Sequence, residues 1–232
     1  MKIMTFNTQH CRNFLTGEID FRRMSDAILA CAPDIVGLNE MRGQGTVAEY
    51  GAQVEALAAL TGMPYFYFAK AIDVLGKGPY GNGILSRIPI LSVETVMIPD
   101  PAVKTHQRHY ETRCVLKAVL EGGITVLVTH MGLNPDEQEN AVSTVVANLA
   151  RERCVLMGDF NMTPENPCLT PIFEAMTDTS KVFDREQLSF PSDAPNCKID
   201  YIFVSHDVDV RAAEIPAIVA SDHRPIVATV EF

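Results

Sequence analysis

The chain has 232 residues, of which 47% are hydrophobic and 21% are charged, and its formal net charge is −10. This composition is that of an ordinary globular protein, and the acidic balance argues against a protein that holds long nucleic acid through its overall field. The length fits one domain, so we expect residues 1–232 to form a single domain.

The N-terminus and the cysteines indicate the cellular setting. The first residues reach polar side chains at once, and no apolar run is long enough to span a membrane. We therefore expect a cytoplasmic protein, and a monomer. The six cysteines lack CxxC or zinc-finger spacing and mostly lie in apolar runs, so we expect free, buried thiols.

Short strands with helices between them are predicted along the whole chain. In order, strands are expected at residues 2–7, 34–39, 65–69, 80–86, 91–98, 112–121, 124–130, 154–159, 199–205, 208–215 and 226–232. Helices are expected at residues 21–32, 46–62 and 135–149 and within 164–176. Thr46 and Glu49 form a capping box at the start of the second helix. Residues 70–79, 99–110 and 184–197 read as loops, and the whole as one α+β domain with more than one sheet.

Polar residues gather where the apolar strands end or begin. Each alone is typical of a turn, but together they weaken that interpretation; they are Asn7, Glu40, His130, Asp159, Asn161, Asp222 and His223. Asp200 differs, because it lies in or beside an apolar strand, where a carboxylate is costly unless it is paired. His223 is its obvious partner, since a carboxylate fixes the imidazole tautomer and raises its basicity.

The stretch from Gly158 to Asn161 contains the most informative pair. Side chains two apart on an extended chain point the same way, so we expect Asp159 and Asn161 to project together and Phe160 to turn into the core. Asp159 could orient a water, and Asn161 could donate to an anionic oxygen. Attack of water on a phosphate ester needs both.

The remaining polar residues supply the other parts of metal-assisted phosphate ester hydrolysis. Glu40 and Asn7 are hard oxygen ligands of the kind that Mg²⁺ prefers, and Asp222 could support the metal or its surroundings. His130 and His223, with Asn161, could contact the nonbridging phosphoryl oxygens as charge develops.

The same motifs, in the same order, resemble the endonuclease/exonuclease/phosphatase superfamily, which includes relatives of deoxyribonuclease I, abasic-site endonucleases and neutral sphingomyelinases. The resemblance is carried by Met4–Asn7, Ile35–Glu40, Gly81–Ser86, Thr129–Met131, Gly158–Asn161, Ile199–Phe203 and Ser221–Pro225. It implies a deoxyribonuclease I-like four-layer α/β/β/α sandwich and a phosphoesterase that depends on Mg²⁺ or Mn²⁺. One departure is Asn39, where many members have Gln.

The resemblance also implies a role for each matched position. Asn7 and Glu40 match metal-site positions, and Asp159 and Asn161 match the water-orienting and phosphate-binding pair. Asp200 matches the carboxylate that supports the final histidine, His223, and Asp222–His223 matches the final catalytic pair. The substrate side is completed by His130, which matches a phosphate-contacting histidine, and by Arg113 and Asn82.

The sequence leaves three candidate functions. The first is a divalent-metal phosphoesterase whose substrate, nucleic acid, nucleotide, phospholipid or sugar phosphate, is open. The second is a DNA endonuclease or exonuclease of the abasic-site type, which the His- and Arg-containing segment 104–113 favours and the net charge disfavours. The third is a non-catalytic binding module, which the retention of every matched position disfavours.

Overall fold

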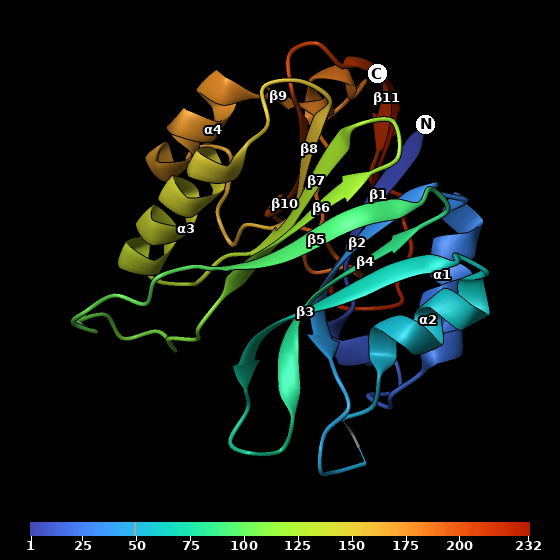
Figure 1. The fold of residues 1–232 in the computed structure, drawn as a ribbon, viewed down its shortest axis with the longest axis vertical. Helices are drawn as coiled ribbons and strands as arrows, with labels where there is room; N and C mark the ends of the chain where they lie inside the picture. The colour runs from blue at the N-terminus through green and yellow to red at the C-terminus, as the bar shows by residue number, and fades with distance from the viewer. Residues whose placement is uncertain (49) are drawn as a thin grey trace.

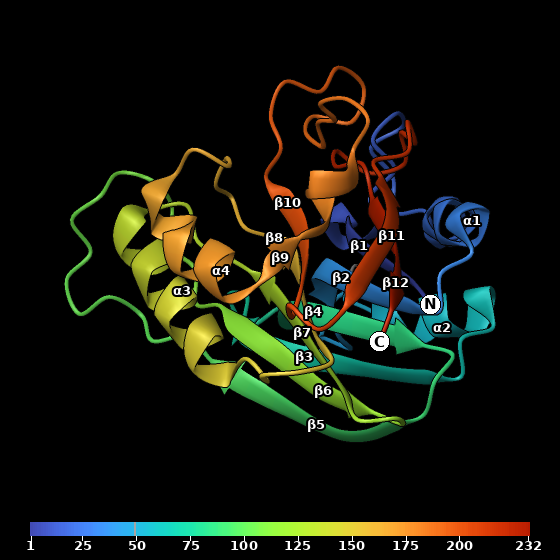
Figure 2. The same cartoon turned by 90° about the horizontal axis from the view of Figure 1, so that it is seen from above.

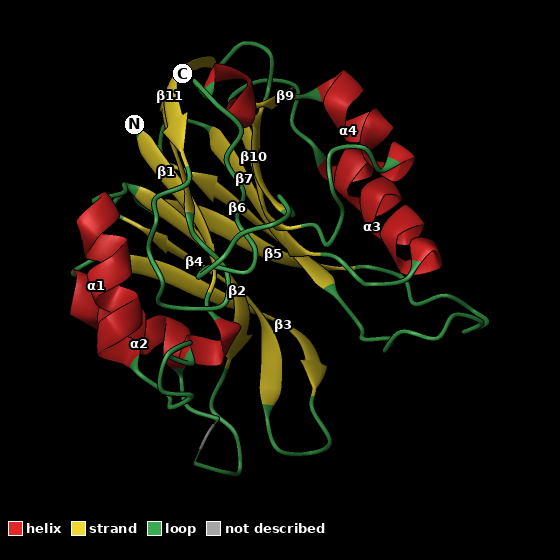
Figure 3. Ribbon diagram, turned by 180° about the vertical axis from the view of Figure 1, so that it is seen from behind, coloured by secondary structure: helices red, strands yellow, loops and turns green. Residues whose placement is uncertain are grey.

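The computed structural model describes residues 1–48 and 50–232. Two six-stranded mixed sheets lie face to face between pairs of helices (Figures 1 and 3). In spatial order, the first sheet contains β11 (Asp209–Glu214), β12 (Ile226–Glu231), β1 (Lys2–Asn7), β2 (Ile35–Arg42), β4 (Pro79–Ser86) and β3 (Tyr65–Asp73). The second contains β5 (Ile90–Met97), β6 (Cys114–Leu120), β7 (Ile124–His130), β8 (Cys154–Asp159), β10 (Asp200–Val204) and β9 (Thr177–Asp178).

Helices cover the outer face of each sheet, which gives four layers (Figure 2). One pair, α1 (Phe21–Cys31) and α2 (Gln53–Thr61), lies on the first sheet, and the other, α3 (Pro135–Asn148) and α4 (Thr170–Ala175), lies on the second. Short 3₁₀ helices are η1 (Gln9–Cys11), η2 (Pro167–Leu169) and η3 (Thr179–Val182). The predicted four-layer α/β/β/α sandwich is confirmed.

Three apolar clusters hold the layers together. The first lies between the sheets and includes Ile35 and Val128; the second lies under α1 and α2, and the third under α3 and α4. All seven residues of β7 and all six of β8 are buried, because both faces of these central strands are covered. Their sequences therefore read as continuous apolar runs that end in polar residues.

Most predicted elements are present, and the differences have local causes. The second helix begins at Gln53, not at residue 46. Thr46 instead donates its hydroxyl to the carbonyls of Gly76 and Lys77, and the proposed partner Glu49 lies outside the described residues. The predicted loop at 70–79 is shorter, because β3 continues to Asp73 and pairs with Pro79 at the start of β4. The two-residue strand β9 was not predicted.

The cysteines and the helices bear on two expectations. All six cysteines are free; four are buried, as predicted, and two are half-buried. Within residues 1–48 and 50–232, none of the helices is long and apolar enough to cross a membrane.

Candidate active site

The ends of the central strands of both sheets meet at one edge of the sandwich. In the first sheet Asn7 pairs in register with Asn39. In the second, Asp159 lies opposite His130 on one side and Asp200 on the other. The sheets are joined here by a hydrogen bond in which Asn7 Nδ2 donates to Asp159 Oδ2 over 3.0 Å. Polar residues from distant parts of the chain thus share one place.

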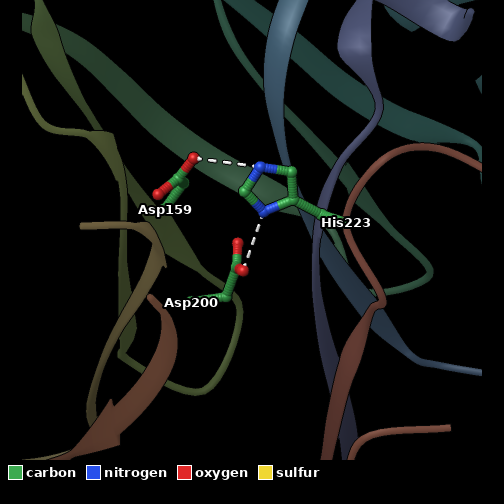
Figure 4. Close-up of side chains that lie close together, drawn as sticks. All are labelled: Asp159, Asp200 and His223. Atoms are coloured by element: carbon green, nitrogen blue, oxygen red, sulfur yellow. Dashed lines mark hydrogen bonds and ion pairs between the residues drawn. The ribbon is translucent and has the colours of Figure 1, made fainter. Parts of the chain in front are cut away.

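His223 lies between two buried carboxylates (Figure 4). Its Nδ1 is 2.9 Å from Asp200 Oδ2 and its Nε2 is 3.6 Å from Asp159 Oδ2. Burial lowers the pKa of His223, but the charges of Asp200 and Asp159 outweigh it and hold the pKa well above the usual range. Burial raises the pKa of Asp159, and the charge of His223 offsets part of that rise. This arrangement holds His223 as an imidazolium beside a carboxylate in a buried part of the protein.

The Gly158–Asn161 stretch is shaped by its close neighbour β7. Gly158 has φ +145°, and a Cβ there would collide with the carbonyl of Thr129, so only glycine fits. Phe160 is fully buried, as predicted. Asn161 adopts a left-handed φ of 51°, so the chain turns there instead of staying extended, and its N–H donates to Asp159 Oδ1 over 2.9 Å.

His130 is held in one tautomer by Arg113. Arg113 Nη1 is 2.7 Å from His130 Nδ1 and 2.9 Å from Glu111. Because a guanidinium can only donate, Nδ1 is the acceptor and the ring proton is on Nε2. Burial, reinforced by the charge of Arg113, lowers the pKa of His130 well below its usual range. The ring proton on Nε2 faces Asp159 Oδ2 at 3.5 Å. Asn161 Nδ2 lies 3.2 Å from Nε2 but donates to the Met131 carbonyl over 3.0 Å and not to the ring, because both nitrogens carry protons.

Glu40 lies on the open side of the cluster. It has a left-handed φ of 60°, in a break of register between Leu38 and Met41 of β2, which turns its side chain toward the site. Its carboxylate is 23% exposed and lies 3.3 Å from Asn7 Nδ2 and 3.6 Å from His10 Nδ1. Burial raises the pKa of Glu40, but these contacts and nearby positive charge outweigh burial and lower it to about 2.

Two further residues, neither of them predicted from the sequence, reach the site from η1. Gln9, His10 and Cys11 have φ values of 47°, 50° and 63°, three consecutive left-handed residues without glycine. Gln9 Nε2 donates to Asp222 Oδ2 over 3.0 Å, and His10 faces Glu40. The only sequence signal is that these polar residues directly follow the strand-end residue Asn7.

Asn82 supports the site from below. Its Oδ1 accepts from Asn39 Nδ2 over 2.8 Å, and its own Nδ2 donates to the Cys114 carbonyl over 2.9 Å. Asn39 also donates to the Thr129 carbonyl and accepts from the Asp159 N–H. Asn82 is 2% exposed, so its carboxamide is occupied within the protein. The predicted contact of Asn82 with substrate stays a prediction.

Two groups of side chains bear on cation binding. The ligand atoms of Asp159, Asp200 and His223 lie within 4.8 Å of one another. However, both ring nitrogens of His223 face the two carboxylates, so the imidazole bridges this group as a donor and leaves no lone pair for an ion. The accessible oxygen donors are on the other side.

Glu40 and Asp222 form the acidic side that fits a divalent ion. Burial raises the pKa of Asp222, the charge of His223 opposes this rise, and the charge of Glu40 adds to it. Such hard oxygen donors suit Mg²⁺ or Mn²⁺. Asn7 presents its amide nitrogen to Glu40 and Asp159, and its Oδ1 accepts from the Gln9 N–H. A role of Asn7 as ligand through Oδ1 requires that its amide rotate.

Comparison with known proteins agrees with this fold. The class defined by the two packed sheets and their flanking helices is the deoxyribonuclease I-like sandwich. The chain belongs to the Endonuclease/Exonuclease/phosphatase family, whose model matches residues 4–223. Members of this family hydrolyse phosphoesters and generally use a divalent metal. Among curated proteins, none matches this sequence.

Solved structures with the same fold are similar over the whole of this chain. An endonuclease/exonuclease/phosphatase from Beutenbergia cavernae is 23% identical, with a TM-score of 0.76 over 100% of this chain and 71% of the other. A mannosyl-6-phosphatase from Bacteroides thetaiotaomicron is 14% identical, with a TM-score of 0.77 over 100% of both chains. A 3′ phosphatase from Neisseria, bound to a product DNA hairpin, is 17% identical, with a TM-score of 0.69 over 100% of both chains.

Proposed function

We propose that this protein is a divalent-metal-dependent phosphoesterase, in which residues 1–232 act as one domain and water attacks a phosphomonoester or phosphodiester. The observation that carries the proposal is the imidazole of His223 between Asp200 and Asp159, at 2.9 and 3.6 Å. The cluster lies beside the accessible carboxylate of Glu40. The expectations of a cytoplasmic location and a monomeric state stay predictions.

Asp159 is the group proposed to orient the attacking water. Its oxygens accept from Asn7 Nδ2 and from the Asn161 N–H, which fix the plane of the carboxylate. An ionised carboxylate has about four acceptor positions, so it can still accept from a water.

His223 and His130 are the groups proposed to bind the phosphoryl oxygens. Their Nε2 atoms lie 3.6 and 3.5 Å from the same Asp159 oxygen, longer than a nitrogen–oxygen hydrogen bond. An oxygen atom of a substrate can therefore take each N–H. Asp200 holds the proton on His223, and Arg113 directs the proton of His130 to Nε2, so that both donors are fixed before substrate binds.

Glu40 and Asp222, with Asn7 after rotation of its amide, would hold the cation. When bound, the ion would neutralise phosphoryl charge and stabilise the leaving oxygen. The family and the sugar and 3′ phosphatases of the same fold support a phosphoesterase. They do not select a substrate for this chain.

A nuclease is the second candidate. The segment 99–113 leads into Arg113 and carries exposed basic side chains, Lys104, His106, Arg108 and His109, which could contact a nucleic acid backbone. The net charge of −10 disfavours a nuclease. Cleavage of abasic duplex DNA in preference to small phosphomonoesters would favour a nuclease over a phosphomonoesterase.

The test is hydrolysis of a panel of phosphomonoesters and phosphodiesters, including abasic duplex DNA, in Mg²⁺ or Mn²⁺ and in EDTA. We expect hydrolysis of one class that EDTA abolishes, and we expect Glu40→Gln to lose most of it because the accessible anionic ligand is removed. Glu121→Gln, at an exposed turn between strands, is the control and should retain activity. The absence of hydrolysis of every ester would contradict the proposal and favour a binding module.

A further inference from the structure

We propose that His10 is a ligand of the cation, paired with Glu40, so that the site selects a first-row transition ion such as Mn²⁺ over Mg²⁺. The inference rests on the proposed function, because it takes Glu40 as a cation ligand. It adds an imidazole donor from η1, a segment to which the sequence assigned no role.

The separation of the two side chains fits two ligands of one ion. His10 Nδ1 and Glu40 Oε2 are 3.6 Å apart, beyond the range of about 2.7–3.2 Å for a nitrogen–oxygen hydrogen bond. Two ligand atoms that each lie about 2.1 Å from one ion are about 3 to 4 Å apart for the usual bond angles. The pair is therefore spaced as neighbouring ligands are.

The backbone conformation that aims His10 at Glu40 is costly and specifically held. Gln9, His10 and Cys11 are all left-handed, at about 1–2 kcal/mol for each residue that is not glycine. Gln53 Nε2 donates to the His10 carbonyl over 2.8 Å, and Gln9 is tied to Asp222 over 3.0 Å. Glu40 is also left-handed. Backbone strain in η1 and at Glu40, on either side of the space between His10 and Glu40, is typical of a functional site.

His10 is also the available imidazole of the cluster. The side chains of His130 and His223 are 5% and 6% exposed, and their nitrogens face Arg113 and the carboxylates. The side chain of His10 is 22% exposed and that of Glu40 is 23% exposed, so an ion can reach both from solvent.

The donor set determines which ion is favoured. Mg²⁺ is bound through oxygen and keeps several waters, whereas an imidazole donor raises affinity for first-row transition ions. A site built from Glu40, Asp222 and His10 therefore favours Mn²⁺ and its heavier neighbours, while a site without His10 would not discriminate in this way.

The test is electron spin echo spectroscopy of Mn²⁺ bound to the full chain, which detects nitrogen coordinated to the ion. We expect nitrogen modulation in the wild type, its loss in His10→Asn, and Mn²⁺ affinity at least about tenfold weaker in that variant, with Mg²⁺ affinity little changed. Asparagine tolerates a left-handed φ, so the turn should survive, and circular dichroism checks the fold. His206→Asn, at an exposed histidine, is the control and should keep the modulation.

Two outcomes would overturn the inference separately from the proposed function. Bound Mn²⁺ without nitrogen modulation, or modulation that persists in His10→Asn, would show that His10 is not a ligand while leaving a metal-dependent phosphoesterase intact. Failure of the wild type to bind Mn²⁺ or Mg²⁺ at all would contradict the proposed function together with this inference.

Discussion

Replacement of Asn39 by leucine should destabilise the fold, because one carboxamide joins four strands. Asn39 is fully buried. It donates to Asn82 Oδ1 and to the Thr129 carbonyl, each over 2.8 Å, and accepts from the Asp159 N–H over 3.0 Å. Leucine has nearly the same shape but can make none of these bonds.

The magnitude follows from the groups left behind. A buried donor or acceptor without its partner costs about 1–3 kcal/mol, and three groups lose one. Burial of the leucine side chain offsets roughly 1.5–3 kcal/mol. We expect Asn39→Leu to lower the free energy of unfolding by roughly 3 kcal/mol, a large share of the roughly 5–15 kcal/mol that a domain has.

Equilibrium unfolding in urea, followed by far-UV circular dichroism, measures this loss. Asn148→Leu is the matched control, because Asn148 is half-buried at the end of α3 and donates only to the Thr144 carbonyl of the same helix. The control should change stability by no more than about 0.5 kcal/mol. A loss below about 1 kcal/mol in Asn39→Leu would refute the view that this carboxamide joins the sheets.

Two further predictions concern pH. Asp200→Asn should move the basic limb of the pH–rate profile to lower pH, because the carboxylate that raises the pKa of His223 is lost and the imidazolium loses its proton sooner; an unchanged profile would contradict the pairing. Burial, against the opposing charge of Asp178, lowers the pKa of Lys198 from 10.5 to about 8. Between these values the unfolded chain binds more protons, so stability relative to Lys198→Met should rise with pH by up to about 3 kcal/mol; parallel stability curves from urea unfolding at pH 8 and 10 would exclude it.

The sequence predicted the strands and the polar residues at their ends because both follow from local pattern, whereas the four layers were implied by the family resemblance. Continuous apolar runs such as β7 and β8 arise where a strand is covered on both faces, and their polar ends show where the edge of the sheet lies. Asp200 was predicted to pair with His223 because a carboxylate beside an apolar run needs a partner, and the two lie 2.9 Å apart.

What the sequence could not predict depends on contacts between distant segments. The left-handed turn at Gln9 and His10 is held by Gln53 and Asp222, and neither Gln nor His by itself predicts such a turn. The same is true of Glu40, whose break in register requires the neighbouring strand. Asn82 was predicted from its motif to contact substrate. In the structure its carboxamide is buried and forms hydrogen bonds with Asn39 and the Cys114 carbonyl.

The role of His223 in the reaction is tested by the turnover number of His223→Ala on whichever phosphoester the wild type hydrolyses, at saturating metal. We expect turnover to be abolished, because the donor held between Asp159 and Asp200 is removed, while circular dichroism and the urea midpoint report a folded protein. Turnover close to that of the wild type would contradict the account and show that the reaction takes place elsewhere.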